Sequence, residues 1–274
     1  MWLRDSTNQR HQINPSRQLQ ITHYQHLPPP KVLPYVAYAN KDPTLKTFLR
    51  GVVLLQARYV SHHPYANAFQ APPESGIRPT GWHSDNVFPP MDSTEVYEAK
   101  YEVDSLSAFL KISYHYHAAT GDVSFVFHPI WMAAAEKAVL TMRHQQEATF
   151  DSEGRQNIPR YNFTRHAQNP TDTQFLGGNG QPIRFTGMIK SHFRPSDDSS
   201  VFPFFVPGNA MASVELEHLA QLLDTAGANK ELSQQARAFS VEIRNAIYKN
   251  AVVKHPEFGD IFACESIGFF LLEC

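Results

Sequence analysis

The sequence predicts an all-α fold in which helical hairpins are joined by long loops, an arrangement that suits an α/α toroid. Five segments place apolar residues about 3.6 positions apart, which is the period of an amphipathic helix. Little of the chain alternates apolar and polar residues as half-buried strands do. Segments 61–97 and 151–205 are far longer than ordinary loops, and such loops in a compact domain are usually functional or disordered. We therefore expect one domain whose loops, gathered at one end, carry the functional site.

The first two predicted helices have clear start and stop signals. Asp42-Pro43 opens the first helix, which ends before His62-His63-Pro64. The second helix runs from Glu102 to about Ala119, and Gly121 stops it. Their stripes consist of Leu45, Phe48, Leu49, Val52, Leu55 and Tyr59 in the first helix and of Leu106, Phe109, Leu110, Ser113 and Tyr116 in the second.

Three further helices follow the same pattern. His128-Pro129 starts the third, which continues to about Gln146. The fourth covers about 208–225 and ends at Gly227, a residue type common just after helix ends. The fifth covers about 232–250, with its apolar residues in helical register.

Composition excludes several classes of protein. Of 274 residues, 42% are hydrophobic and 18% charged, which is typical of globular proteins, and the net charge is −2. No long basic or acidic block is present, so we expect neither nucleic acid nor an anionic membrane as a partner. No apolar run approaches the roughly 18 residues that a transmembrane helix needs.

The cellular compartment stays open. Cys264 and Cys274 are too few for a disulfide framework or a four-cysteine metal site. The sequon Asn162-Phe163-Thr164 would accept a glycan in the secretory pathway, although such triplets also occur by chance. The opening residues Met1–Ser6 lack the basic and then apolar segment of a signal peptide.

The segment Phe193–Asp198 is the strongest local candidate for chemistry. Pro195 fixes its own φ and favours an extended Arg194, so the segment is a shaped loop. Asp197 and Asp198 are adjacent carboxylates, and a nearby arginine can hold one ionised while burial keeps the other protonated. The alternative is structural, because Ser-Asp-Asp after a proline is also an ordinary helix start.

No metal site is expected. The pair His62-His63 and the segment His115–His117 contain residue types that bind zinc, but neither has partners at a convincing spacing.

Four segments in order resemble one family. Met1–Ser6 resembles its MWLRDS signature, and His63–Phe69 is similar to its PYANxF loop. Glu98–Leu106 resembles its E-x-K-Y-E-x-D-S-L helix start, and Phe193–Asp198 matches FRPSDD, followed by Val206–Asn209 in place of IPSN. The chain thus resembles glycoside hydrolase family 125, the metal-independent exo-α-1,6-mannosidases with an (α/α)6 fold, over about residues 1–265.

This resemblance implies an inverting hydrolysis of terminal α-1,6-linked mannose, without a cofactor. In such a mechanism one carboxylic acid protonates the leaving oxygen while a carboxylate activates water on the opposite face. By position in the motif, Asp197 corresponds to the general acid, and Asp198 is expected to be a cap or an orienting partner. The expected binders of mannose hydroxyls are Arg4, Asp5, Asn67 and Glu98, with Asn209 supporting the acid or the sugar. The implied partner is a mannose-containing oligosaccharide or N-glycan.

The departures from the family pattern lead to further expectations. The chain starts inside MWLRDS, and after Glu265 the family's E-V-D-G gives way to an aberrant tail, 266–274. The family's general base lies in a later His-Glu-Ser-Phe segment that is absent here, so we expect a partial toroid domain over 1–265 that is inactive alone. The tryptophan of the family's MTWSxF segment is replaced by Lys190.

Three alternatives remain open at this point. The chain is part of an exo-α-1,6-mannosidase, or a non-catalytic mannose-binding pseudoenzyme, or an incomplete gene product that folds poorly. A toroid enzyme for another glycoside is a weaker alternative, since it requires the four motifs to be coincidental.

Overall fold

The computed structural model describes residues 33–81, 85–266 and 271–272. Five long helices dominate it, and each predicted helix is confirmed with boundaries that shift by at most a few residues. A short helix, α2, precedes them and was not predicted. The helices are α2 Leu33–Val36, α3 Pro43–His62, α4 Val103–Thr120, α5 Pro129–His144, α6 Val206–Ala226 and α7 Lys230–Asn250.

The helix ends are satisfied by the residues that the sequence marks. The Asp42 carboxylate accepts hydrogen bonds from the backbone of Thr44 (2.8 Å) and Leu45 (3.2 Å), as an N-cap residue does. Gly121 and Gly227 end α4 and α6 in the left-handed conformation, which glycine adopts at little cost. These local signals explain why the helix limits follow from sequence.

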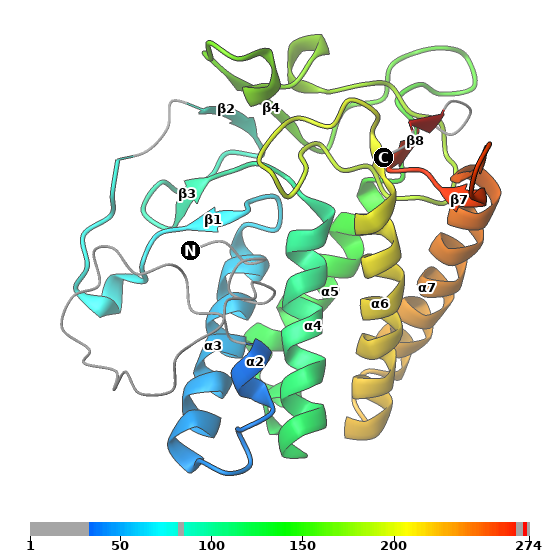
Figure 1. Ribbon diagram of the computed structural model, residues 1–274. Coiled ribbons are helices and arrows are strands. Elements are labelled where there is room, and N and C mark those ends of the chain that lie inside the picture. The colour runs from blue at the N-terminus through cyan, green and yellow to red at the C-terminus, as the bar shows by residue number, and fades with distance from the viewer. Residues whose placement is uncertain (1–32, 82–84, 267–270, 273–274) are drawn as a thin grey trace.

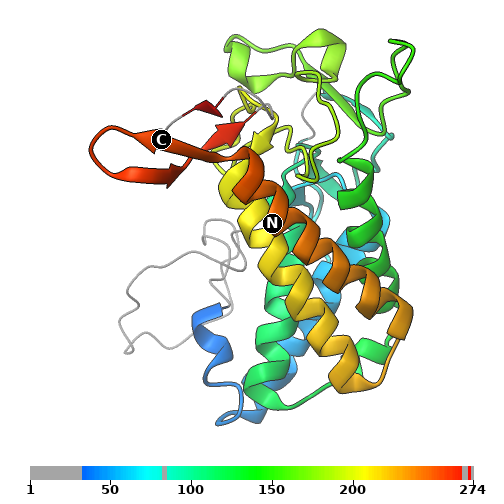
Figure 2. The same ribbon diagram turned by 90° about the vertical axis from the view of Figure 1, so that its right-hand side faces the viewer.

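The helices pack along their lengths around one core. α3 packs against α5, α4 against α6, and α6 against α7 (Figures 1 and 2). Trp131 on α5 is fully buried, and its indole N–H donates to the Ser113 hydroxyl of α4 at 3.0 Å. Of these pairs, α6 and α7 are consecutive in the chain and form an antiparallel α/α hairpin. The N-termini of α4 and α6 and the C-termini of α3, α5 and α7 lie at one end (Figure 1).

Among the described residues, four small antiparallel sheets connect the loops at that end. Their pairs are β1 Ala68–Phe69 with β3 Val96–Glu98, β2 Asp85–Phe88 with β4 Asn162–Arg165, β5 Phe204–Phe205 with β8 Glu265–Ser266 and β9 Leu271–Leu272, and β6 Val252–His255 with β7 Gly259–Phe262. Short 3-10 helices occur at Pro73–Ser75, Ser124–Phe127, Pro170–Asp172 and Leu176–Gly178. Strands of two to four residues are too short to leave a period-two signal in sequence, so none of them was predicted.

Three further sequence-based expectations concern the two ends of the chain and membrane-spanning helices. Arg4 and Asp5 lie outside the described residues. The boundary between 1–265 and a tail of 266–274 stays a prediction, although Ser266 is buried and pairs with Phe204 in the β5–β8 sheet. None of the described helices combines the length and hydropathy required to cross a bilayer.

Candidate active site

Phe193–Asp198, called the acid loop below, is a tight turn at the loop end of the helices. The backbone N–H of Asp197 donates to the Arg194 carbonyl (2.9 Å), and that of Arg194 donates to the Asp198 carbonyl (2.8 Å). Phe193 and Ser199 close the turn as an antiparallel bridge. The helix start that was the local alternative does not form here, because α6 begins only at Val206.

Asp197 has a left-handed backbone, with φ at 67°. This region is uncommon for residues other than glycine, and it carries strain when the surroundings impose it. Strained residues cluster at functional sites, so an observed outlier at the predicted acid is a reason to assign function there.

Asn67 brings the predicted acid and a predicted sugar-binding residue together. Its side-chain N–H donates to the Asp197 carboxylate (3.3 Å) and to the Glu98 carboxylate (3.4 Å). Its side-chain oxygen accepts the backbone N–H of Lys100 at 3.1 Å. Asn67 is fully buried, and Glu98 is 5% exposed. Two carboxylates 31 and 130 positions away from Asn67 in the chain thus flank one amide.

Glu98 is held ionised by a buried network that sequence patterns did not reveal. The Arg165 guanidinium donates to Glu98 at 2.8 Å and pairs with both oxygens of Asp85, at 2.5 and 2.8 Å. The β2–β4 sheet sets Arg165 directly opposite Asp85. Burial alone would raise the pKa of Glu98. Lys100, Arg165 and the Asn67 amide outweigh burial and lower that pKa below its ordinary value.

Lys100 links the two carboxyl-bearing segments. Its ammonium donates to the backbone carbonyl of Asp197 at 2.8 Å and lies 3.5 Å from the Glu98 carboxylate. It also lies 5.3 Å from the centre of the Phe193 ring, within the range of a cation–π contact. Lys100 therefore supports the strained residue through its backbone and Glu98 through charge.

The far side of the acid loop is held by a second ion pair, in which only the carboxylate is buried. Arg194 donates to Glu265 at 2.6 Å, and the other Glu265 oxygen accepts the backbone N–H of Phe202 at 2.9 Å. The Glu265 side chain is only 2% exposed. Arg194 therefore has a structural contact in this turn, and both oxygens of Glu265 are used to anchor it.

Asn209 lies apart from the Asn67 cluster and supports the segment before the acid loop. Its amide group donates to the carbonyls of Ile189 and Phe205, each at 2.9 Å, and its oxygen accepts the Ile189 N–H at 2.6 Å. Asn209 is fully buried. Its role as a sugar binder stays a prediction, and its contacts are those of a support for the acid loop.

The structure thus brings together three of the predicted site residues, namely Asn67, Glu98 and Asp197. It adds Asp85, Lys100 and Arg165, which sequence reasoning missed. Lys100 lies within the motif that begins at Glu98, so its position was a usable signal. Asp85 and Arg165 lie in short strands without a motif, and only the strand register reveals their contact with Glu98.

The histidines considered as metal ligands have other partners. Both His62 (2.9 Å) and His63 (3.2 Å) contact the same oxygen of Glu95. Within the described residues, no group of three or more His, Cys, Asp or Glu side chains is arranged to hold a metal ion.

The strain at Asp197 leads to a stability prediction. We expect Asp197→Gly to be more stable than Asp197→Ala by about 1 kcal/mol, because both remove the carboxylate and only glycine accepts φ of 67° without cost. Urea unfolding of the two variants measures this difference. Equal stabilities, or a more stable alanine variant, would show that the turn relaxes and that the strain is not maintained.

Lys190 is a second buried cation just before the acid loop. Its ammonium donates to the carbonyls of Asn179 (2.5 Å) and Gln181 (3.1 Å), and burial lowers its pKa to about 8. Below pH 8 both the folded and the unfolded chain carry this proton, so the cost of burying the charge is fully present. Between pH 8 and the ordinary lysine pKa, the folded state has lost the proton and the unfolded state has kept it. Stability therefore rises with pH in that interval.

We expect the free energy of unfolding to rise by about 1–2 kcal/mol between pH 7.5 and 9.5, relative to the variant Lys190→Met. Unfolded tyrosines begin to ionise near the upper end of this interval, and the comparison with Lys190→Met removes their contribution because both proteins contain them. Urea unfolding at the two pH values measures the difference. If the rise is the same in both proteins, Lys190 is not its source.

Comparisons with known proteins agree with this geometry. The model of the family described as metal-independent alpha-mannosidase (GH125) matches residues 30–271. The Meiotically up-regulated gene 157 protein of Schizosaccharomyces pombe is 36% identical over 271 residues, which cover 98% of this chain and 48% of that protein. A metal-independent alpha mannosidase of Streptococcus pneumoniae, solved as a non-productive substrate complex with alpha-1,6-mannobiose, is 27% identical with a TM-score of 0.76. That match covers 88% of this chain and 53% of the other.

The chain therefore spans about half the length of these two relatives. The similarity to the solved mannosidase confirms the predicted fold class, an incomplete (α/α)6 toroid built from helical hairpins.

Proposed function

Because the chain belongs to the GH125 family of metal-independent α-mannosidases, we propose that it carries the terminal-mannose site and the general acid of an inverting exo-α-1,6-mannosidase. The observation that carries this proposal is the Asn67 amide, which joins the carboxylates of Asp197 and Glu98. Asp197, the predicted acid, and Glu98, the predicted sugar binder, therefore both contact the same amide group.

The two carboxyl groups suit different tasks. Glu98, with its lowered pKa and two nearby cations, is an ionised acceptor that suits the hydroxyl hydrogens of mannose. Asp197 would act as the acid. The Asn67 N–H donates to one Asp197 oxygen and so orients the carboxyl group that would supply the proton. That proton passes to the glycosidic oxygen as its bond to the anomeric carbon breaks.

An inverting mechanism also needs a carboxylate base about 6.5–9.5 Å from the acid, so that a water fits between them. We propose that the 274 residues do not supply this base. Glu265 is held by Arg194 and by the Phe202 N–H, which leaves it unsuited to activating water. Asp260 is exposed on the β6–β7 hairpin, opposite Lys254. We expect the base to come from a segment outside this sequence.

The proposal is tested by incubating the 274-residue chain with α-1,6-mannobiose and measuring free mannose by chromatography. We expect binding and no appreciable release of mannose. If the chain does release mannose and Asp197→Asn abolishes the release, Asp197 is supported as the acid. The proposal that the 274 residues lack a base is then wrong. Binding of the disaccharide, measured in the same preparation, shows that a negative result comes from a folded protein.

A mannose-binding protein without catalysis is the second candidate function. The Glu98 network favours it equally, because a preformed carboxylate acceptor for hydroxyl groups binds sugar whether or not hydrolysis follows. The transcript sequence around the coding region separates the two candidates. If an in-frame His-Glu-Ser-Phe segment follows, the extended polypeptide is expected to release mannose. If that extended protein binds mannobiose and leaves it intact, the non-catalytic function holds.

A further inference from the structure

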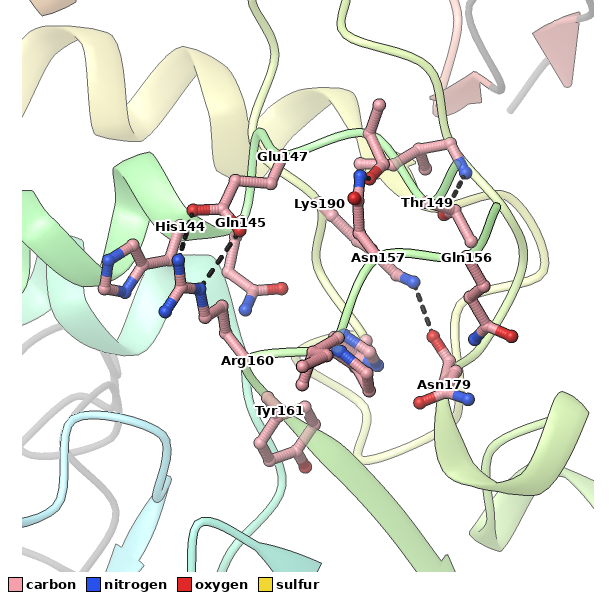
Figure 3. A pocket seen from close by; sticks show the side chains of 15 residues that line it. His144, Gln145, Glu147, Thr149, Gln156, Asn157, Arg160, Tyr161, Asn179 and Lys190 are labelled. Carbon is pink, nitrogen blue, oxygen red and sulfur yellow. Dashed lines mark hydrogen bonds and ion pairs between the residues drawn. The ribbon is translucent and has the colours of Figure 1, made fainter. Parts of the chain in front are cut away.

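A small cavity lies behind the acid loop, separate from the Asn67 cluster. Its volume is about 60 Å³, and it lies between the C-terminal end of α5, the loop 147–160 and the segment 179–192 (Figure 3). Among the described residues that line it are Gln145, Asn157, Tyr161, Asn179, Lys190 and His192, whereas Asn67, Glu98 and Asp197 are not. A water-sized group needs about 10–15 Å³ on this measure, so roughly four such groups fit.

Lys190 contributes a donor to this cavity. Two of its three N–H groups are used by the carbonyls of Asn179 and Gln181. No described carboxylate accepts the third, and the residue is only 8% exposed. A buried ammonium with one unused donor is costly unless a further acceptor completes its shell.

Two more polar atoms at this cavity have no partner. The Nδ1 atom of His192 and the side-chain oxygen of Asn179 are both buried without a hydrogen bond. His192 is 3% exposed as a residue, and its ring packs edge-on against Tyr161 with the ring centres 4.7 Å apart. Unsatisfied buried groups are rare and call for an explanation, of which a ligand is one.

Gly180 keeps the space between these groups open. A Cβ atom there would lie 3.5 Å from both His192 Nδ1 and Lys190 Nζ, and 2.6 Å from the Gln174 side-chain oxygen. Gly180 also has a φ of +66°, which disfavours any side chain. The glycine-rich segment 177–180 has no part in the proposed function. Its Gly180 leaves a space that both His192 Nδ1 and Lys190 Nζ border.

The donors and acceptors define the ligand. Lys190 only donates, and the Asn179 oxygen only accepts. An anion would satisfy Lys190 and be repelled by the Asn179 oxygen. A hydroxyl group satisfies both, because it accepts and donates. We propose that this cavity is a second carbohydrate subsite, which takes two neighbouring hydroxyls or the hydroxymethyl end of a sugar outside the hydrolysed bond.

The position of the cavity fits a glycan that extends from the candidate active site. Tyr161, which forms one wall, donates its hydroxyl proton to the Ala99 carbonyl (2.7 Å) and accepts the Tyr101 N–H (3.0 Å), next to Glu98 and Lys100. His192 directly precedes the acid loop. Lys190 occupies the position at which the family's MTWSxF segment has tryptophan. We therefore expect this subsite in this chain and not in family members that keep the tryptophan. That the ligand is a sugar rests on the proposed function.

Nuclear magnetic resonance of the ¹⁵N-labelled 274-residue chain tests the subsite. Glycerol, α-methyl mannoside, α-1,6-mannobiose and sulfate are each titrated, while the side-chain amides of Asn179 and Asn67 and the ring nitrogens of His192 are followed. We expect saturable shifts of Asn179 and His192 with the sugars, with a dissociation constant different from that seen at Asn67. Lys190→Met and Asn179→Ala should each weaken the His192 response at least tenfold and leave Asn67 unchanged.

Lys230→Met, an exposed lysine at the start of α7, is the matched control and should change neither response. Asn179 is partly exposed, so its variant keeps the test valid if Lys190→Met fails to fold. Shifts at Asn67 without shifts at Asn179 and His192 would overturn the subsite and leave the proposed function standing. Shifts at His192 without shifts at Asn67 would support the second subsite and overturn the proposed mannose site at Asn67. A response to sulfate and to no sugar would identify an anion site and overturn the proposal.

Discussion

Replacing Arg165 by methionine is expected to lower the free energy of unfolding by about 3–5 kcal/mol. The change removes the cation between Asp85, whose side chain is fully buried, and Glu98, which is 7% exposed at its side chain. Two carboxylates would then remain in the interior with one compensating cation, Lys100. Removing one partner of a buried ion pair costs far more than the pair itself contributes, because the charge left behind is neither solvated nor paired.

The matched control is Arg155→Met. Arg155 also pairs with two acidic residues, Asp151 and Glu153, but its side chain is 70% exposed. Exposed ion pairs contribute about 0–1 kcal/mol, so this variant should unfold almost as the parent does. Similar losses in the two variants, measured by urea unfolding, would contradict the assignment of Arg165 as the support of Glu98.

Replacing Phe193 by alanine is expected to cost about 3–5 kcal/mol and to loosen the acid loop. The ring is fully buried and packs edge-on against Phe163 at 4.9 Å, with the Lys100 ammonium over its face. Its loss leaves a cavity under the turn that holds Asp197. We therefore expect weaker mannobiose binding together with lower stability in urea unfolding.

Phe175→Ala is the comparison for this variant, since Phe175 is 44% exposed and lies in the loop before the glycine-rich segment. It should change stability by less than about 1 kcal/mol. If Phe193→Ala retains the mannobiose affinity of the parent despite its loss of stability, the acid loop does not depend on this packing.

The helices were predictable because their signals are local. Asp42 and Gly121 act within one turn of the helix ends that they mark, and apolar spacing reports burial directly. Asn67, Glu98 and Asp197 were predicted as site residues through motifs, and the structure shows that Asn67 contacts the other two. Their mutual contacts were not predictable, because Asn67 and Asp197 are 130 positions apart in the sequence and meet only in the folded chain.

The supporting residues escaped prediction for the same reason. Asp85 and Arg165 are 80 positions apart and are aligned by a four-residue strand pair that has no sequence signature. The composition of the sequence does not distinguish Lys190 from an ordinary surface lysine. Its burial is evident only in the structure, as is the cavity beside it. Long-range register is set by packing of the whole chain, which local patterns do not encode.

The central claim is that Asn67, Glu98 and Asp197 form a mannose-binding site, and calorimetric titration with α-1,6-mannobiose tests it most directly. We expect saturable binding by the 274-residue chain, at least tenfold weaker in Glu98→Gln and unchanged in Glu153→Gln, whose carboxylate is 66% exposed. Circular dichroism shows whether each variant is folded. A folded parent chain that binds no mannobiose, or a Glu98→Gln variant that binds as tightly as the parent, would contradict the claim.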